Sequence, residues 1–156
     1  MGPLVAEALA APFVDLDRVI ADRAGQTTAQ VFAETGESGF RALERDEMRR
    51  AIAGTPSVIA AGGGWAAQPG NLESVEKRAL TVYLRVAPEV AASRTATTPD
   101  TRPLLGGGEV RQQMIELLRA RQVFYQRSEA AVDAGQPPAS VAQEVANLAR
   151  SLGGWY

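Results

Sequence analysis

The 156-residue sequence contains neither cysteine nor histidine. Their absence excludes disulfide bonds, thiol nucleophiles, Ser-His-Asp triads and nearly all zinc sites. Any chemistry must therefore depend on carboxylates, arginines and backbone amides. The sequence also lacks a long apolar run and a secretory signal, so we expect a cytoplasmic protein with no membrane partner.

Lysine is almost absent, because Lys77 is the only one in the chain. No GxxxxGK(S/T) phosphate-binding loop surrounds it. The net charge of −2 gives no broad attraction to nucleic acid, so no nucleic-acid partner is expected. Arginine suits bidentate capture of carboxylate and phosphate, although genomic base composition is an equally good explanation of the arginine bias.

The pattern of apolar residues predicts one α/β domain over residues 1–156. Short apolar runs at residues 12–15, 57–61, 80–86 and 130–133 are typical of buried strands. Helical spacing occurs at residues 41–53, 72–77, 88–94, 110–127 and 140–152. This alternation predicts a parallel sheet covered on both faces, with glycine-rich loops at residues 62–64 and 106–108. Residues 2–11 resemble the end of a helix that no strand precedes.

Two carboxylates, Asp15 and Asp17, follow the first apolar run. Spacing of two on a strand would put both on one face, at the sheet edge where α/β proteins bind ligands. Such a pair could hold Mg²⁺ through water and accept a proton from a hydroxyl. The alternative is that Asp17 only caps the helix that follows.

Other polar segments allow similar pairs of interpretations. The glycines at residues 62–64 would let the backbone approach an anion, or would form an ordinary turn. Arg102 lies in a segment that could close over phosphates, or could be a solvated surface loop. Arg41 and Glu44 are three residues apart, so the acid could hold the guanidinium, and Arg121 lies in a predicted helix whose solvated face would also explain it.

In chain order, several segments together resemble the shikimate kinase family, within the P-loop kinases of nucleoside-monophosphate-kinase type. They are FVDLD at 13–17, GQTTAQVFAETGESGFRALE at 25–44, GGG at 62–64, RPLL at 102–105 and RQVFY at 121–125. The resemblance implies a three-layer P-loop kinase-like fold with a parallel sheet. It also implies a monomer that uses ATP and Mg²⁺ to phosphorylate the 3-hydroxyl of shikimate, in the aromatic amino acid (chorismate) pathway.

The resemblance further implies roles at the acceptor site. Asp17 would bind the substrate hydroxyls and act as base. Arg41 and Arg121 would hold the carboxylate, and Gly63 and Gly64 would offer backbone N–H groups. Glu44 would orient Arg41.

At the nucleotide site, the resemblance implies that Asp15 holds Mg²⁺ through water. Arg102 would neutralise the transferring phosphoryl group from a lid at about residues 95–110. Arg94 would lie near the adenine, as would the loop at residues 135–138.

The sequence departs from the family pattern at its start, where an apolar strand and GxxxxGKST would precede the first helix. We therefore expect the central first strand, between the strands ending near Ala61 and Val86, to be missing from this chain, and the chain to be inactive unaided. A late gene start is our hypothesis for this departure. Trp65 and Thr28 also depart from the pattern, which leaves open a related acceptor such as aminoshikimate or a sugar acid. A nonenzymatic shikimate-binding relative is the third possibility.

Overall fold

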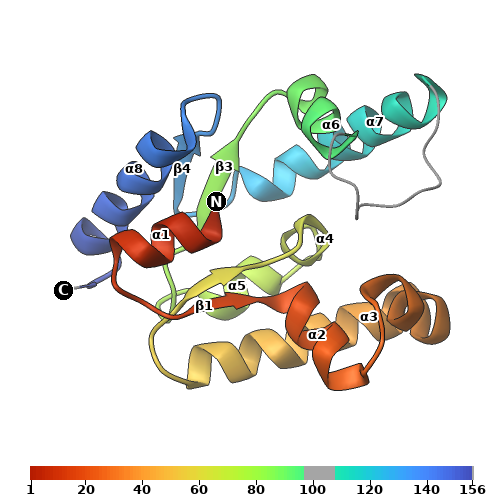
Figure 1. The fold of residues 1–156 in the computed structure, drawn as a ribbon, viewed down its shortest axis with the longest axis horizontal. Coiled ribbons are helices and arrows are strands. Elements are labelled where there is room, and N and C mark those ends of the chain that lie inside the picture. Colours follow the sequence, from red (N-terminus) through yellow and green to blue (C-terminus); the bar gives the residue numbers. More distant parts are fainter. Residues whose placement is uncertain (97–107, 156) are drawn as a thin grey trace.

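The computed structural model describes residues 1–96 and 108–155 (Figure 1). Helices and strands alternate along the chain as the sequence predicts. The strands are β1 (Phe13–Asp15), β2 (Val58–Ala60), β3 (Val82–Arg85) and β4 (Ala130–Asp133). The helices are α1 (Gly2–Ala8), α2 (Leu16–Ala24), α3 (Thr28–Ala53), α4 (Gly63–Ala66), α5 (Asn71–Val75), α6 (Pro88–Ala96), α7 (Gly108–Tyr125) and α8 (Pro138–Ser151).

The strands pair in parallel, which confirms the predicted α/β class. β1 pairs with β2 in the register Phe13↔Val58. β3 pairs with β4 in the register Val82↔Ala130. Across residues 1–96 and 108–155 these form two separate two-stranded sheets, with no ladder between β2 and β3.

Helices cover both sides of these sheets (Figure 1). On one side α1 packs against α8, where Val5 and Leu9 contact Ala142 and Ala146. On the other side the core contains residues from α2, α3, α4 and α5, namely Leu16, Met48, Trp65 and Val75. None of the helices in the described ranges is long and apolar enough to cross a membrane.

Local sequence signals explain where several helices begin and end. Thr27 and Gln30 form a capping box at the start of α3, each satisfying a backbone N–H group of the first turn. Gly25 ends α2 in the left-handed conformation, with φ 64°, which favours glycine. Pro138 occupies the first turn of α8, where its missing N–H costs nothing.

One sequence prediction about local structure is wrong, and one stretch of helix was not predicted. The glycines at residues 62–64 were expected in a loop, but Gly63 and Gly64 begin the short helix α4 and only Gly62 precedes it. The first half of α3, residues 28–40, was not predicted as helix. Gly36, at φ 69° and ψ 178°, interrupts the helical dihedrals there and hides the period.

Candidate functional site

The candidate site is built around Gly62–Gly64, called the Gly62–Gly64 turn below, in which Gly62 caps α4 and Gly63 and Gly64 are its first residues. Gly64 packs so closely on Arg41 that a Cβ at this position would overlap both terminal nitrogens and the central carbon of the guanidinium. A Cβ at Gly63 would lie 2.7 Å from the hydroxyl oxygen of Tyr125. Glycine is therefore required here because side chains from α3 and α7 press against the backbone.

Arg41 projects from the second half of α3, and its side chain is only 12% exposed. Its Nη1 lies 2.7 Å from Glu44 Oε2, and its Nη2 lies 3.7 Å from Glu37 Oε1. Its Nε is buried and has no hydrogen-bond partner among the described residues. Glu44 and Glu37 thus hold the two terminal nitrogens of the guanidinium, while its Nε is enclosed by the protein.

Glu44 is the carboxylate that fixes Arg41, and its side chain is 1% exposed. Burial raises the pKa of Glu44, and the hydrogen bond and charge of Arg41 oppose this rise. The charge of Asp17 also raises this pKa, while that of Arg121 lowers it. The charges of Arg41, Asp17 and Arg121 therefore all act on the pKa of Glu44, as expected if these residues belong to one site.

Arg121 and Tyr125 reach the same turn from the carboxyl half of α7. Arg121 Nη1 lies 3.8 Å from the position that a Cβ at Gly63 would take. The Tyr125 hydroxyl donates a hydrogen bond of 3.0 Å to the Gly63 carbonyl oxygen. Burial raises the pKa of Tyr125, partly offset by the charge of Arg121.

Asp17 faces the site from the first turn of α2, and its Oδ1 lies 3.5 Å from the Cβ position of Gly62. The predicted strand geometry of this acid pair is wrong, because β1 ends at Asp15 and Asp17 is already helical. The alternative prediction, that Asp17 caps the helix after it, names the wrong residue. Asp15 is the N-cap, and its Oδ1 accepts a hydrogen bond of 3.3 Å from the Arg18 N–H group. The Asp15 carboxylate thus caps α2, whereas that of Asp17 lies beside Gly62.

The structure therefore brings together the predicted acceptor-site residues Asp17, Arg41, Gly63, Gly64 and Arg121, along with Glu44. Sequence reasoning did not assign a role to Tyr125. The available signal was its spacing of four residues from Arg121 on a helix, which places both side chains on one face.

The predicted nucleotide-side residues are not gathered in the same way. Arg94 Nη1 donates a 3.0 Å hydrogen bond to the Ala134 carbonyl oxygen, which brings it to the loop predicted beside the adenine. Arg102 and most of the predicted lid lie outside the described residues. In the described ranges, no three or more acidic residues cluster where they could hold a metal ion.

Trp65 and Thr28, the two departures from the family pattern, lie in different environments. Trp65 is 3% exposed and packs in the core with Leu16, Met48 and Val75. Thr28 begins α3, and its hydroxyl donates a hydrogen bond of 3.5 Å to the Asp17 carbonyl oxygen. The Trp65 backbone N–H donates a hydrogen bond of 2.9 Å to the Gly62 carbonyl oxygen, but its side chain packs in the core, so core packing explains its size.

This arrangement suits a small hydroxy acid. Two guanidinium groups provide donors for a carboxylate next to the exposed residue Gly63, and arginine is the side chain best shaped for bidentate capture. The carboxylate of Asp17 can accept hydrogen bonds from hydroxyl groups. The buried Glu44 neutralises part of the positive charge of the two arginines. A bound anion therefore has to neutralise only the remainder.

The chain matches the family model described as shikimate kinase over residues 1–150. It is 36% identical over 153 residues to a shikimate kinase of Rhodococcus jostii, covering 96% of this chain and 89% of the relative. The crystal structure of shikimate kinase from Bacteroides thetaiotaomicron superposes with a TM-score of 0.84 and 31% identity, over 95% of this chain and 89% of that one. The shikimate kinase from Acinetobacter baumannii, solved in complex with shikimate, gives a TM-score of 0.81 and 29% identity, over 98% and 85% of the chains. These matches over nearly the whole sequence show that the chain belongs to the shikimate kinase family, a family of small-molecule kinases.

Proposed function

We propose that this protein binds shikimate at the Gly62–Gly64 turn, and that shikimate bound there is the acceptor whose 3-hydroxyl is phosphorylated by ATP. The observation that carries the proposal is the convergence of Arg41, Arg121 and Asp17 on one glycine turn. The family membership of the chain supports the same substrate, as does the relative that was solved with shikimate.

In this proposal each residue of the site has one role. Arg41 and Arg121 hold the carboxylate of shikimate, and Gly63 and Gly64 offer backbone N–H groups to the same ligand. Asp17 orients the hydroxyl groups and accepts the proton of the one that reacts. Glu44 is a positioning residue, because it acts only by holding Arg41 at 2.7 Å.

The described residues fit only part of a nucleotide site. Mg²⁺ in kinases is held by one or two carboxylates together with substrate phosphates, and Asp15 can supply one carboxylate through water. Arg94 and the loop after β4 offer a place for the base. No GxxxxGK(S/T) motif occurs in the 156 residues, so the phosphates have no such cradle and we derive no transfer step. We propose that the 156-residue chain binds the acceptor but does not transfer phosphoryl groups unaided.

Calorimetric titration with shikimate tests the acceptor site. Arg41→Ala removes charge-assisted hydrogen bonds worth about 1.5–3 kcal/mol, so we expect affinity to fall about 10- to 150-fold. Gly64→Ala should weaken binding as well, because its methyl group displaces the Arg41 guanidinium. The matched controls are Arg49→Ala, an exposed arginine of the same helix, and Gly54→Ala, where the added methyl group has ordinary contacts. Equal loss in the controls, or no shikimate binding by the unaltered folded chain, would refute the assignment.

Activity is tested separately from binding. The 156-residue chain and a version extended at its amino terminus by an apolar strand and a GxxxxGK(S/T) loop are assayed with ATP, Mg²⁺ and shikimate. We expect transfer only by the extended chain. Transfer by the 156-residue chain would overturn the proposed inactivity, whereas shikimate binding without transfer by either chain would favour a nonenzymatic relative.

A related acceptor is the second candidate, and Thr28 supports it through its contact with Asp17. Competition of aminoshikimate and sugar acids against shikimate measures this preference. If one of these compounds binds more tightly than shikimate, that compound would be assigned as the acceptor, and the residues of the site would stay as proposed.

A further inference from the structure

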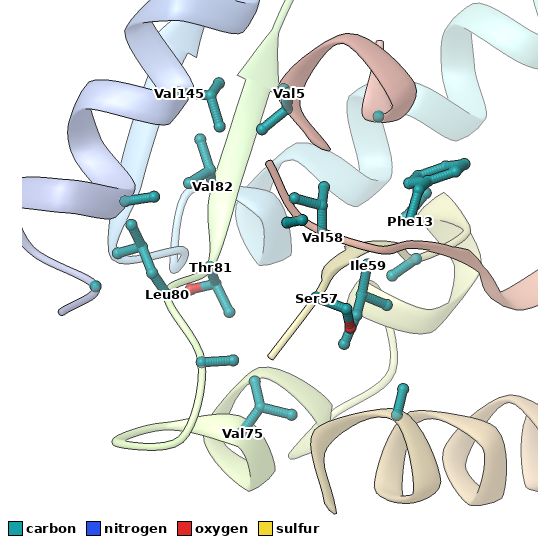
Figure 2. Close-up of a pocket in the computed structure, with 18 of the residues that line it drawn as sticks. Val5, Phe13, Ser57, Val58, Ile59, Val75, Leu80, Thr81, Val82 and Val145 are labelled. Atoms are coloured by element: carbon teal, nitrogen blue, oxygen red, sulfur yellow. The ribbon is translucent and has the colours of Figure 1, made fainter. Parts of the chain in front are cut away.

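Tyr125 lies at the candidate site, but the proposed function gives it no role. It is the last residue of α7, and together with Gly63 it borders the cavity of about 1480 Å³ between the β1–β2 and β3–β4 sheets (Figure 2). Its side chain shares a helix face with Arg121, because residues four apart on a helix are neighbours. The Tyr125 hydroxyl therefore lies where the acceptor site meets this cavity.

The hydroxyl group of Tyr125 gives its proton to the turn. It donates a hydrogen bond of 3.0 Å to the Gly63 carbonyl oxygen. A Cβ at Gly63 would lie 2.7 Å from the same hydroxyl oxygen, so the absence of a side chain at Gly63 makes this approach possible. A phenol has one hydrogen to donate, and its oxygen keeps lone pairs that can accept. With its proton directed to Gly63, the Tyr125 oxygen is an acceptor for any further partner.

Arg121 is the donor beside this oxygen. Its Nη1 lies 3.8 Å from the same Cβ position of Gly63, so guanidinium and hydroxyl meet at one point of the turn. Burial raises the pKa of Tyr125, whereas the charge of Arg121 and a hydrogen bond from its side chain lower it. A guanidinium has donors and no acceptor, so the direction of this contact is fixed. The N–H groups of Arg121 face the Tyr125 oxygen, and the Tyr125 O–H faces the Gly63 carbonyl.

Packing alone does not fix the Tyr125 ring. The ring contacts that of Tyr83 on β3, with centroids 5.3 Å apart and planes inclined at 44°. A second cavity, of about 90 Å³, is lined by both tyrosines together with Leu118 and Gln122 of α7. Side chains that border such a space lack packing contacts on that side. The hydroxyl bond to Gly63 is thus the contact that fixes the end of the Tyr125 side chain.

We propose that Tyr125 is a positioning residue for Arg121: its hydroxyl, directed by the Gly63 carbonyl, accepts a hydrogen bond from the guanidinium and holds it against the Gly62–Gly64 turn. The other arginine of the site has a comparable partner, since Glu44 holds Arg41 at 2.7 Å. The two partners differ in charge. Glu44 neutralises part of the charge of Arg41, whereas a neutral phenol orients Arg121 and leaves its charge for the substrate carboxylate. This role rests on the proposed function, because it concerns how the same site holds shikimate.

Two phenylalanine variants of the 156-residue chain test this role by calorimetry with shikimate. Tyr125→Phe removes the hydroxyl and keeps the ring, and the matched control Tyr83→Phe removes a hydroxyl from the ring beside it. We expect Tyr125→Phe to weaken shikimate binding about 3- to 10-fold, the size of one hydrogen bond. Tyr83→Phe should leave the affinity within about twofold. In an Arg121→Lys background, which lacks the planar guanidinium, Tyr125→Phe should change the affinity by less than about twofold, because the two residues act as one unit.

A spectroscopic test needs no ligand. A guanidinium that is held in place rotates slowly and gives separate N–H signals for its two terminal nitrogens in nitrogen–proton correlation NMR spectra. The signals that disappear in Arg121→Lys belong to Arg121. We expect Tyr125→Phe to merge these signals and Tyr83→Phe to keep them separate, with native circular dichroism in both variants.

Three results would overturn the proposed role of Tyr125. They are equal effects of the two phenylalanine variants on shikimate binding, an effect of Tyr125→Phe that persists undiminished in the Arg121→Lys background, and Arg121 signals that Tyr125→Phe leaves unchanged. Failure of the unaltered folded chain to bind shikimate would instead refute the proposed function. The NMR comparison would then still decide whether Tyr125 holds Arg121.

Discussion

At the scale of single residues, the candidate site is a balance between buried opposite charges. Glu44 is 1% exposed and holds Arg41, which is 12% exposed. Removing charges from water is costly, and the pair survives because the geometry is short and direct at 2.7 Å. Breaking such a pair by removing one partner costs about 3–5 kcal/mol in other proteins. Gly64 adds a steric limit, since any side chain there would occupy the place of the guanidinium.

The raised pKa of Glu44 predicts how stability depends on pH. Burial raises this pKa above its ordinary value of 4.5, so the folded state binds the proton more tightly than the unfolded state. The resulting stabilisation is fully present below the pKa of the unfolded chain and is lost as the pH rises through the folded pKa. Relative to Glu44→Gln, which cannot titrate, we expect the free energy of unfolding of the parent protein to decline from pH 4 upward and then level off.

Urea denaturation across this pH range measures the difference. Glu37→Gln is the control, because Glu37 borders the same arginine but has a side chain 67% exposed. A difference between parent and Glu44→Gln that stays constant with pH, or rises, would contradict the assignment of the raised pKa to Glu44.

At the scale of secondary-structure elements, Gly36 determines the course of α3. Its φ of 69° and ψ of 178° lie in a region that is essentially restricted to glycine. Val31 before this position and Phe40 after it both pack with Ile20 of α2, so the interruption lets both parts of α3 contact one neighbour. The part after Gly36 carries Arg41 to the site.

Gly36→Ala should therefore destabilise the protein by about 1–3 kcal/mol, because alanine cannot adopt these dihedrals without strain. Gly54→Ala is the control, since Gly54 has a negative φ of −87° and room for a methyl group. The free energy of unfolding from denaturant titration gives both values. Similar values for the two variants would show that the interruption of α3 does not require glycine.

The sequence predicts the elements better than their junctions. All four strands were predicted from apolar runs, because burial on both faces leaves a composition that is easy to see. The end of β1 was not predicted, since an aspartate after a strand suits both a strand-end carboxylate and a helix cap. The order of motifs was sufficient to name Arg41, Glu44 and Arg121. Tyr125 was missed because its hydrogen bond to Gly63 joins residues 62 positions apart.

At the scale of the whole molecule, α1 connects the two sheets. Val5 of α1 and Leu9, the residue that caps its carboxyl end, pack with α8, and Val58 of β2 contacts the same cluster. Arg150 of α8 donates a 2.6 Å hydrogen bond to the Ala8 carbonyl oxygen, and Trp155 donates one of 3.3 Å to that of Leu9. Because no ladder joins β2 to β3 in residues 1–96 and 108–155, much of the coupling between the halves passes through α1.

Leu9→Ala should consequently weaken both the stability and the cooperativity of unfolding. Loss of a buried leucine side chain costs about 2–5 kcal/mol, whereas Leu4→Ala, on the same helix but 40% exposed, should cost within about 0.5 kcal/mol. Trp65 lies in the core beside α3 and Trp155 lies beside α8, so tryptophan fluorescence observes both halves, while circular dichroism observes all helices. In Leu9→Ala we expect the two unfolding curves to separate, because halves that are weakly coupled no longer unfold as one unit. Coincident curves with a stability equal to that of Leu4→Ala would show that contacts other than those of α1 hold the halves together.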